Sequence, residues 1–175
     1  MAFRFEDLTP RTRLYMEQEL DFDLRQVNHF VSPRLTNDGK VQFHRLLREA
    51  MRSGDEQTLA ASLEGFFETY EARRTTSGVQ LVKVPKNAGE SLAEAEFNRY
   101  YIRALCLQAG ETEETLRVYR AKEVASPRAA SEEKIGQKVN PYRLLQDLRV
   151  STSFDSALGL PAGANSGLSV RIENT

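Results

Sequence analysis

The chain has 175 residues, a length that suits one domain, or one domain with an extended arm. It contains 24 Lys and Arg against 25 Asp and Glu, and the resulting net charge of −1 argues against a non-specific nucleic-acid binder, which carries a basic excess. Hydrophobic residues make up 40% of the chain, enough for a modest core, and no window approaches the roughly 18 apolar residues of a membrane span.

The single cysteine, Cys106, rules out an intrachain disulfide and a cysteine-based metal site. It lies in an apolar segment, where a free cysteine is usually a small core residue. A lone thiol of this kind fits a reducing compartment. Because the first residues also lack the apolar stretch of a secretory signal, we expect a cytoplasmic protein.

Three helices are predicted in the first 75 residues. Thr9 can cap a helix that begins at Pro10 and continues to about residue 28. The apolar residues of 41–51 recur with the period of an amphipathic helix. A third apolar stripe follows Asp55 and extends to Tyr70. This outline also matches a helix-turn-helix DNA reader, but the third helix begins with acidic and small residues, which are poorly suited to reading bases.

Short strands and helices are predicted to alternate in residues 76–150. The polar, turn-rich stretch 73–78 marks the expected boundary with the helical unit. We expect strands at 79–84 and 116–124, a long helix at 91–109, one or two helical turns at 129–135 and a short helix at 141–149.

The helix at 91–109 is apolar on most of its circumference, so the rest of the protein or a partner must enclose it. Glu96, Arg99 and Arg103 form its only polar seam. The arginines can form salt bridges to Glu96 and to other carboxylates, and the alternative is an anion or phosphate clamp. We also regard Arg99 and Arg103 as candidate interface residues.

The strand at 116–124 carries the densest basic cluster of the chain, formed by Arg117, Arg120 and Lys122. Tyr119 lies on the same strand, and several glutamates around it dilute the positive charge. We interpret this strand first as an interface or a solvated face, and second as a nucleic-acid contact.

From residue 151 the composition becomes rich in Gly, Ser and Ala. Such a segment contributes little core of its own, and its spaced apolar residues are typical of an arm that a subunit extends onto a neighbour. A strand is expected at 168–172. The candidate contact residues of this arm are Phe154, Leu158, Leu160, Val170 and Ile172.

No catalytic, metal or cofactor site is predicted. His29 and His44 have no Cys, Asp or Glu at the spacing of a metal-binding motif. No nucleophile or phosphate-loop motif occurs, and the acidic residues are spread too evenly to select a general acid and base.

Two segments, FNRYYIRALC and VYRAKEVASPR, followed by SEEKIG and LLQDLR, resemble uncharacterised proteins encoded in bacteriophage and prophage genomes. The resemblance covers about residues 96–149. It implies a head-associated or other virion role after assembly in a bacterial host, and it transfers no functional residues.

These observations predict an α+β chain with a helical unit (1–75), an α+β region built on the 91–109 helix (76–150) and an extended arm (151–175). The leading hypothesis is a non-enzymatic structural or assembly protein, acting as a repeated subunit or adaptor with other protein subunits, as a homo-oligomer or in a larger complex. The alternative is a nucleic-acid-associated protein that uses the Arg/Lys face. An enzyme of unrecognised type is the third hypothesis.

Overall fold

The computed structural model describes residues 2–76, 78–151 and 166–173. Helices dominate these residues and short antiparallel strands form two small sheets, which confirms the α+β class. Within the described ranges no helix is both long and apolar enough to cross a membrane. The helices are α1 (Pro10–Gln26), α2 (Asn37–Ser53), α3 (Glu56–Ser62), α4 (Ala88–Thr112), α5 (Ala129–Glu132) and α6 (Pro141–Val150). The strands are β1 (Tyr70–Thr75), β2 (Gly78–Lys83), β3 (Thr115–Arg120), β4 (Lys138–Val139) and β5 (Leu168–Glu173).

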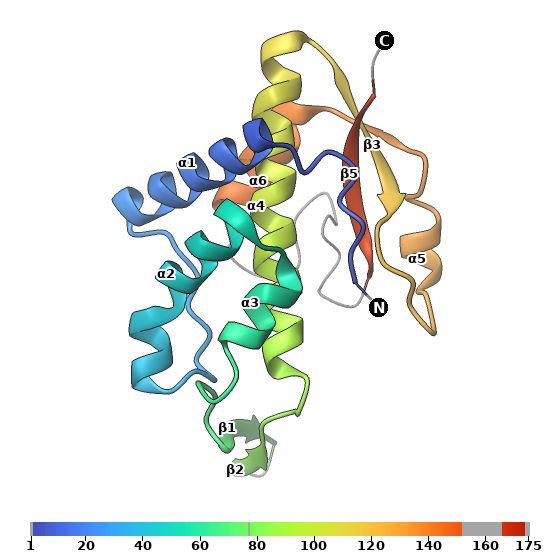
Figure 1. The fold of residues 1–175 in the computed structure, drawn as a ribbon. Coiled ribbons are helices and arrows are strands. Elements are labelled where there is room, and N and C mark those ends of the chain that lie inside the picture. Colours follow the sequence, from blue (N-terminus) through green and yellow to red (C-terminus); the bar gives the residue numbers. More distant parts are fainter. Residues whose placement is uncertain (1, 77, 152–165, 174–175) are drawn as a thin grey trace.

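Helix α4 is the centre of the structure (Figure 1). Helices α1, α2 and α3 lie on one side of it, the three-stranded sheet lies on another, and α6 packs beside it. Every residue from Ala95 to Cys106 is buried, on all sides of the helix. Of the two predicted ways to enclose this helix, by the rest of the protein or by a partner, the structure shows the first, and Cys106 is a core residue as expected.

The three-stranded sheet is antiparallel, with β3 between β4 and β5. Leu116 and Val118 of β3, with Leu168 and Val170 of β5, point into the core against α4. The strand predicted at 168–172 is confirmed, and it pairs with β3 of its own chain. The apolar residues predicted to make contacts at 154, 158 and 160 lie outside the described residues.

The three N-terminal helices form, but the third is shorter than its apolar stripe predicts. Helix α3 ends at Ser62, so the prediction of helix as far as Tyr70 is wrong. Gly65 adopts a left-handed conformation with φ of +84°, which interrupts the helical path. Phe66 and Phe67 nevertheless pack against the core from the loop that follows, and Phe67 forms an isolated bridge with Leu35.

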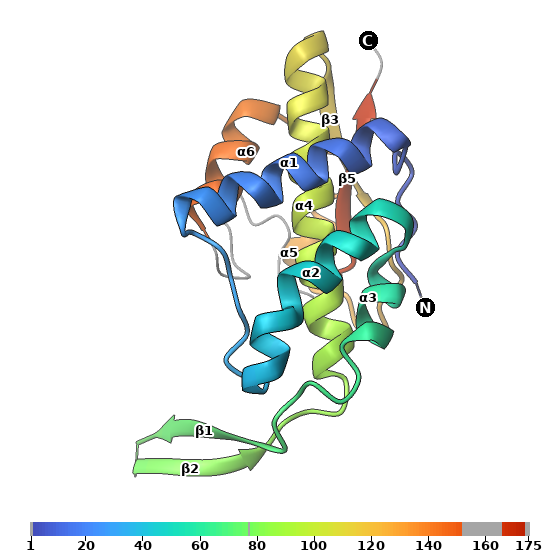
Figure 2. The same cartoon turned by 60° about the vertical axis from the view of Figure 1, so that its left-hand side comes forward.

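Strands β1 and β2 form a two-stranded hairpin, in which they pair antiparallel from Tyr70↔Lys83 to Thr75↔Gly78. From the stretch predicted as a polar boundary, residues 73–75 and Gly78 form the far end of the two strands. Figure 2 shows that the hairpin projects from the helical body. One hydrophobic cluster joins residues of α1–α3 to residues of α4, α6, β3 and β5.

Candidate functional site

One face of the β1–β2 hairpin exposes large apolar side chains. Tyr70 is 59% exposed, and Val79 and Leu81 are each 71% exposed. Residues that face each other across an antiparallel pair project from the same side of the sheet. The register therefore gathers these three side chains on one surface, which we call the outer face. Its members are Tyr70, Ala72, Arg74, Val79, Leu81 and Lys83.

The opposite face of the hairpin is fixed to the body of the protein. Arg34 donates two hydrogen bonds to the Glu71 carboxylate, at 2.7 and 3.0 Å. These bonds hold the pKa of the Glu71 carboxyl below its ordinary value. Val82, beside Glu71 in the register, is half-buried. The outer face consequently points to solvent.

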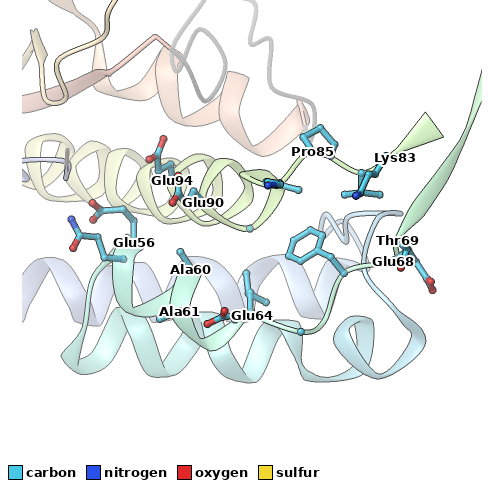
Figure 3. A pocket seen from close by; sticks show the side chains of 18 of the residues that line it. Glu56, Ala60, Ala61, Glu64, Glu68, Thr69, Lys83, Pro85, Glu90 and Glu94 are labelled. Atoms are coloured by element: carbon cyan, nitrogen blue, oxygen red, sulfur yellow. The ribbon is translucent and has the colours of Figure 1, made fainter.

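A groove of about 670 Å³ lies at the base of the hairpin, between α3 and the first turns of α4 (Figure 3). Small and apolar residues form much of its lining, including Ala60, Leu63 and Phe67. Lys83 lines the groove and also belongs to the outer face, so the two surfaces are continuous. The charged lining residues are Glu56, Glu64, Glu68, Glu90, Glu94, Lys83, Lys86 and Lys122.

The glutamates of the groove differ in their surroundings. Glu56 is buried, accepts a hydrogen bond from the Phe3 backbone N–H at 2.8 Å, and has its pKa raised by burial. Glu94 forms an ion pair with Lys122. The remaining three, Glu64, Glu68 and Glu90, are exposed and have no ion pair among the residues that the structure describes. Together with the exposed Lys83 and Lys86, they give the groove a charged rim with a small acidic excess.

The hairpin and groove have the chemistry of a binding surface. An exposed apolar patch next to charged groups is typical of surfaces that bind other molecules. Nowhere in 2–76, 78–151 and 166–173 do three His, Cys, Asp or Glu side chains come together in an arrangement that could hold a metal ion.

The structure places the two arginines of the α4 seam inside the protein. Arg103 is 1% exposed and donates to Asp23 at 2.6 and 2.8 Å and to Glu19 at 2.7 Å. Arg99 donates to the Ser151 carbonyl at 2.5 Å and lies 3.6 Å from Glu96. The predicted pairing with carboxylates is confirmed. The prediction that these side chains lie at an interface is corrected, because burial between α1, α4 and α6 keeps them from a partner.

This buried charge cluster also includes the Glu96 carboxylate, and the half-buried Arg149 lies at its edge. Arg149 of α6 pairs with Glu19, and Tyr100 donates its hydroxyl hydrogen to Asp23 at 2.9 Å. Glu96 is 2% exposed, and burial raises its pKa to about 7 although Arg99 and the nearby Arg103 favour its charged form. This cluster is an internal link between α1, α4 and α6.

The basic residues predicted on the third strand are each held by an acidic partner within the chain. Arg117 pairs with Glu173 at 2.5 Å, Arg120 pairs with Glu132, and Lys122 pairs with Glu94. These partners lie on three different segments, so the cations are directed apart. They do not form the continuous basic surface that a nucleic acid requires.

Three further predicted contact residues belong to the same sheet. Tyr119 is 7% exposed and donates its hydroxyl hydrogen to the Arg4 carbonyl at 2.6 Å. Val170 is fully buried and Ile172 is partly buried against the core. The N-terminal segment covers this region, since the Ile172 N–H donates to the Asp7 carboxylate at 2.9 Å. Tyr119 and Val170 are therefore internal residues, which corrects their prediction as contacts to a neighbouring subunit.

The two histidines, His29 after α1 and His44 in α2, meet in the structure. Their ring centroids are 4.6 Å apart, with the rings nearly perpendicular. Burial, together with the neighbouring His29, lowers the pKa of His44 to about 4. His44 is therefore neutral at physiological pH, and the pair packs the loop after α1 against α2.

Sequence reasoning missed the outer face because it assigned Tyr70 to a helix and 73–78 to a boundary. A usable signal was present. Two six-residue segments, YEARRT and GVQLVK, flank small polar residues, and such a pattern is typical of a hairpin.

Comparisons of the chain with protein-family models, curated proteins and solved structures give no match. Any assignment of function to this site depends on the geometry and chemistry of its residues.

Proposed function

We propose that this chain is a non-enzymatic assembly protein, a repeated subunit or adaptor that binds other protein subunits through the outer face of the β1–β2 hairpin. The observation that carries the proposal is the exposure of Tyr70, Val79 and Leu81 on one side of a projecting hairpin. Clustered apolar side chains of this kind are typical of protein contact surfaces, whereas single exposed apolar residues are common on any protein.

The stability of hairpins supports the same proposal. A two-stranded hairpin is only marginally stable in water unless further strands or a helix cover its apolar face. Here the covered face is the one with Glu71 and Val82, and the more apolar face is open. A bound partner would supply the missing layer. A phage particle, which the resemblance implies, would be one setting for such a subunit.

Protein contact is favoured over nucleic-acid contact by the charges. The basic residues of β3 and α4 are paired inside the chain, and the groove beside the hairpin has a charged rim with a small acidic excess. The three glutamates of the rim that have no ion pair among the described residues outnumber its two exposed lysines, Lys83 and Lys86, so the rim repels phosphate groups and attracts basic side chains of a protein.

Thiol labelling in cells tests this function. Cys106 is 2% exposed, so a Val79→Cys variant adds the first accessible thiol. Tyr142→Cys is the matched control, because Tyr142 is also 71% exposed but lies on α6. We expect maleimide to label both variants in dilute purified protein. In cells of the source organism, only the Val79→Cys thiol should be protected. Equal labelling of both variants in cells would show that the outer face has no partner there.

A further inference from the structure

We infer that the occupant of the outer face is a second copy of this chain, bound through a two-fold contact in which the two hairpins pack face to face and antiparallel. This inference rests on the proposed function and names its partner. In a two-fold interface the same patch on both copies must be self-complementary, so its apolar and charged parts have to match after a half-turn.

The outer face has this self-complementarity along its length. From the base of the hairpin to its far end, the register gives the pairs Tyr70↔Lys83, Ala72↔Leu81 and Arg74↔Val79. A half-turn about an axis that lies in the face and crosses both strands places the first pair of one copy over the third pair of the other. The ring of Tyr70 in one copy then lies against the Arg74 guanidinium of the other, and Val79 lies against the apolar stem of Lys83. The Leu81 side chains of the two copies meet at the axis.

The same rotation directs the far end of each hairpin toward the groove of the other copy. The far end carries Arg73 and Arg74, and the groove at the base carries Glu64 and Glu68 on its rim. Arg74 has no ion pair among the described residues, and neither of these glutamates has one there. The two-fold contact brings these opposite charges together twice.

The continuity of the two surfaces makes this geometry feasible. Lys83 belongs to both the outer face and the groove lining. The hairpin of a second copy that lies along the outer face therefore extends directly to the groove. Six residues of strand span about 20 Å, which is the overlap available to two antiparallel hairpins. The edges of both strands remain open on either side.

Charge-swapped variants test the contact by analytical ultracentrifugation of the purified full-length protein. We expect a concentration-dependent dimer for the natural sequence. Arg74→Glu alone and Glu68→Arg alone each place like charges together twice, and each should weaken the dimer about tenfold or more. An equimolar mixture of the two variants should recover the dimer, because positions 74 and 68 carry opposite charges at both of their contacts in the mixed pair.

Leu81→Ser tests the apolar centre, and Gln80→Ser on the opposite face of the same strand is its control. The first should weaken the dimer and the second should leave it unchanged. Both positions lie outside the core, so circular dichroism should show the same folded spectrum for both. A monomer at every concentration, a dimer that persists in Leu81→Ser, or a charge-swapped mixture that stays monomeric would each overturn the two-fold contact. Protection of Val79→Cys in cells combined with a monomeric purified protein would overturn this inference alone, and the proposed function would then stand with a different partner.

Discussion

Replacing the buried Glu96 with glutamine should stabilise the protein at alkaline pH and change it little at acidic pH. Burial raises the pKa of Glu96 from its ordinary 4.5 to about 7. Between these values the folded state holds a proton that the unfolded state has lost, so the free energy of unfolding falls as the pH rises through this window. Glutamine has nearly the same shape and does not ionise, and therefore removes this dependence.

The pKa difference sets the size of the effect. A change from 4.5 to about 7 corresponds to about 3 kcal/mol at pH 8, where the folded protein carries the buried charge in full. At pH 5 the same linkage gives about 1 kcal/mol or less. Urea unfolding of both proteins at the two pH values measures the difference directly.

Glu90→Gln provides the control for this experiment. Glu90 lies on the same helix but is exposed, and it contributes mainly through the helix dipole in the first turn of α4. Its replacement should cost less than about 1 kcal/mol at both pH values. If Glu96→Gln changes stability by the same amount at pH 5 and pH 8, then the linkage assigned to its burial is refuted.

Three further outcomes are expected. Arg103→Met should lower the free energy of unfolding by about 3–5 kcal/mol in urea, because it leaves the Asp23 carboxylate buried without its cation and leaves Glu19 with Arg149 alone. In a proton NMR titration, His44 should titrate near pH 4. Because the unfolded chain takes up this proton near pH 6.5, the free energy of unfolding should fall as the pH is lowered from 6.5 toward 4. Gly167→Ala should loosen β5 and lower the melting temperature, since Gly167 has φ of +64° and an added Cβ would lie 2.1 Å from the Lys122 carbonyl oxygen.

The predictions that succeeded rest on local signals. Thr9 caps α1 by accepting the Thr12 N–H, and Asn140 caps α6 in the same way, as their positions before proline suggest. The apolar circumference of α4 predicted its burial, because a helix with no polar face has to be enclosed. Each of these inferences uses residues within a few turns of one another.

The interface predictions that failed concern residues whose contacts lie far apart in the chain. Asp23 and Arg103 are separated by 80 positions, so no sequence periodicity relates one to the other. From the sequence alone, a helical arginine can be predicted as a surface residue or as a buried one. The terminal strand also depends on contacts with distant residues. The sequence predicts Val170 as part of an arm because few apolar residues surround it in the chain, yet Val170 packs in the core beside β3. Removal of residues 151–175 would therefore damage the fold as well as any arm.

The arrangement of these contacts constrains how an assembly could be built. The ion pairs of α1, α4 and α6 and those of β3 are formed within the chain, so these charges are not available to a partner. The outer face and the groove are two described surfaces that a partner could contact. A two-fold contact between outer faces uses both copies completely and closes at a dimer. A larger assembly would need a second contact of a different kind. Glu90, the exposed glutamate of the groove rim that the two-fold contact does not use, lies on such a surface, and there an added subunit would have to present a basic side chain.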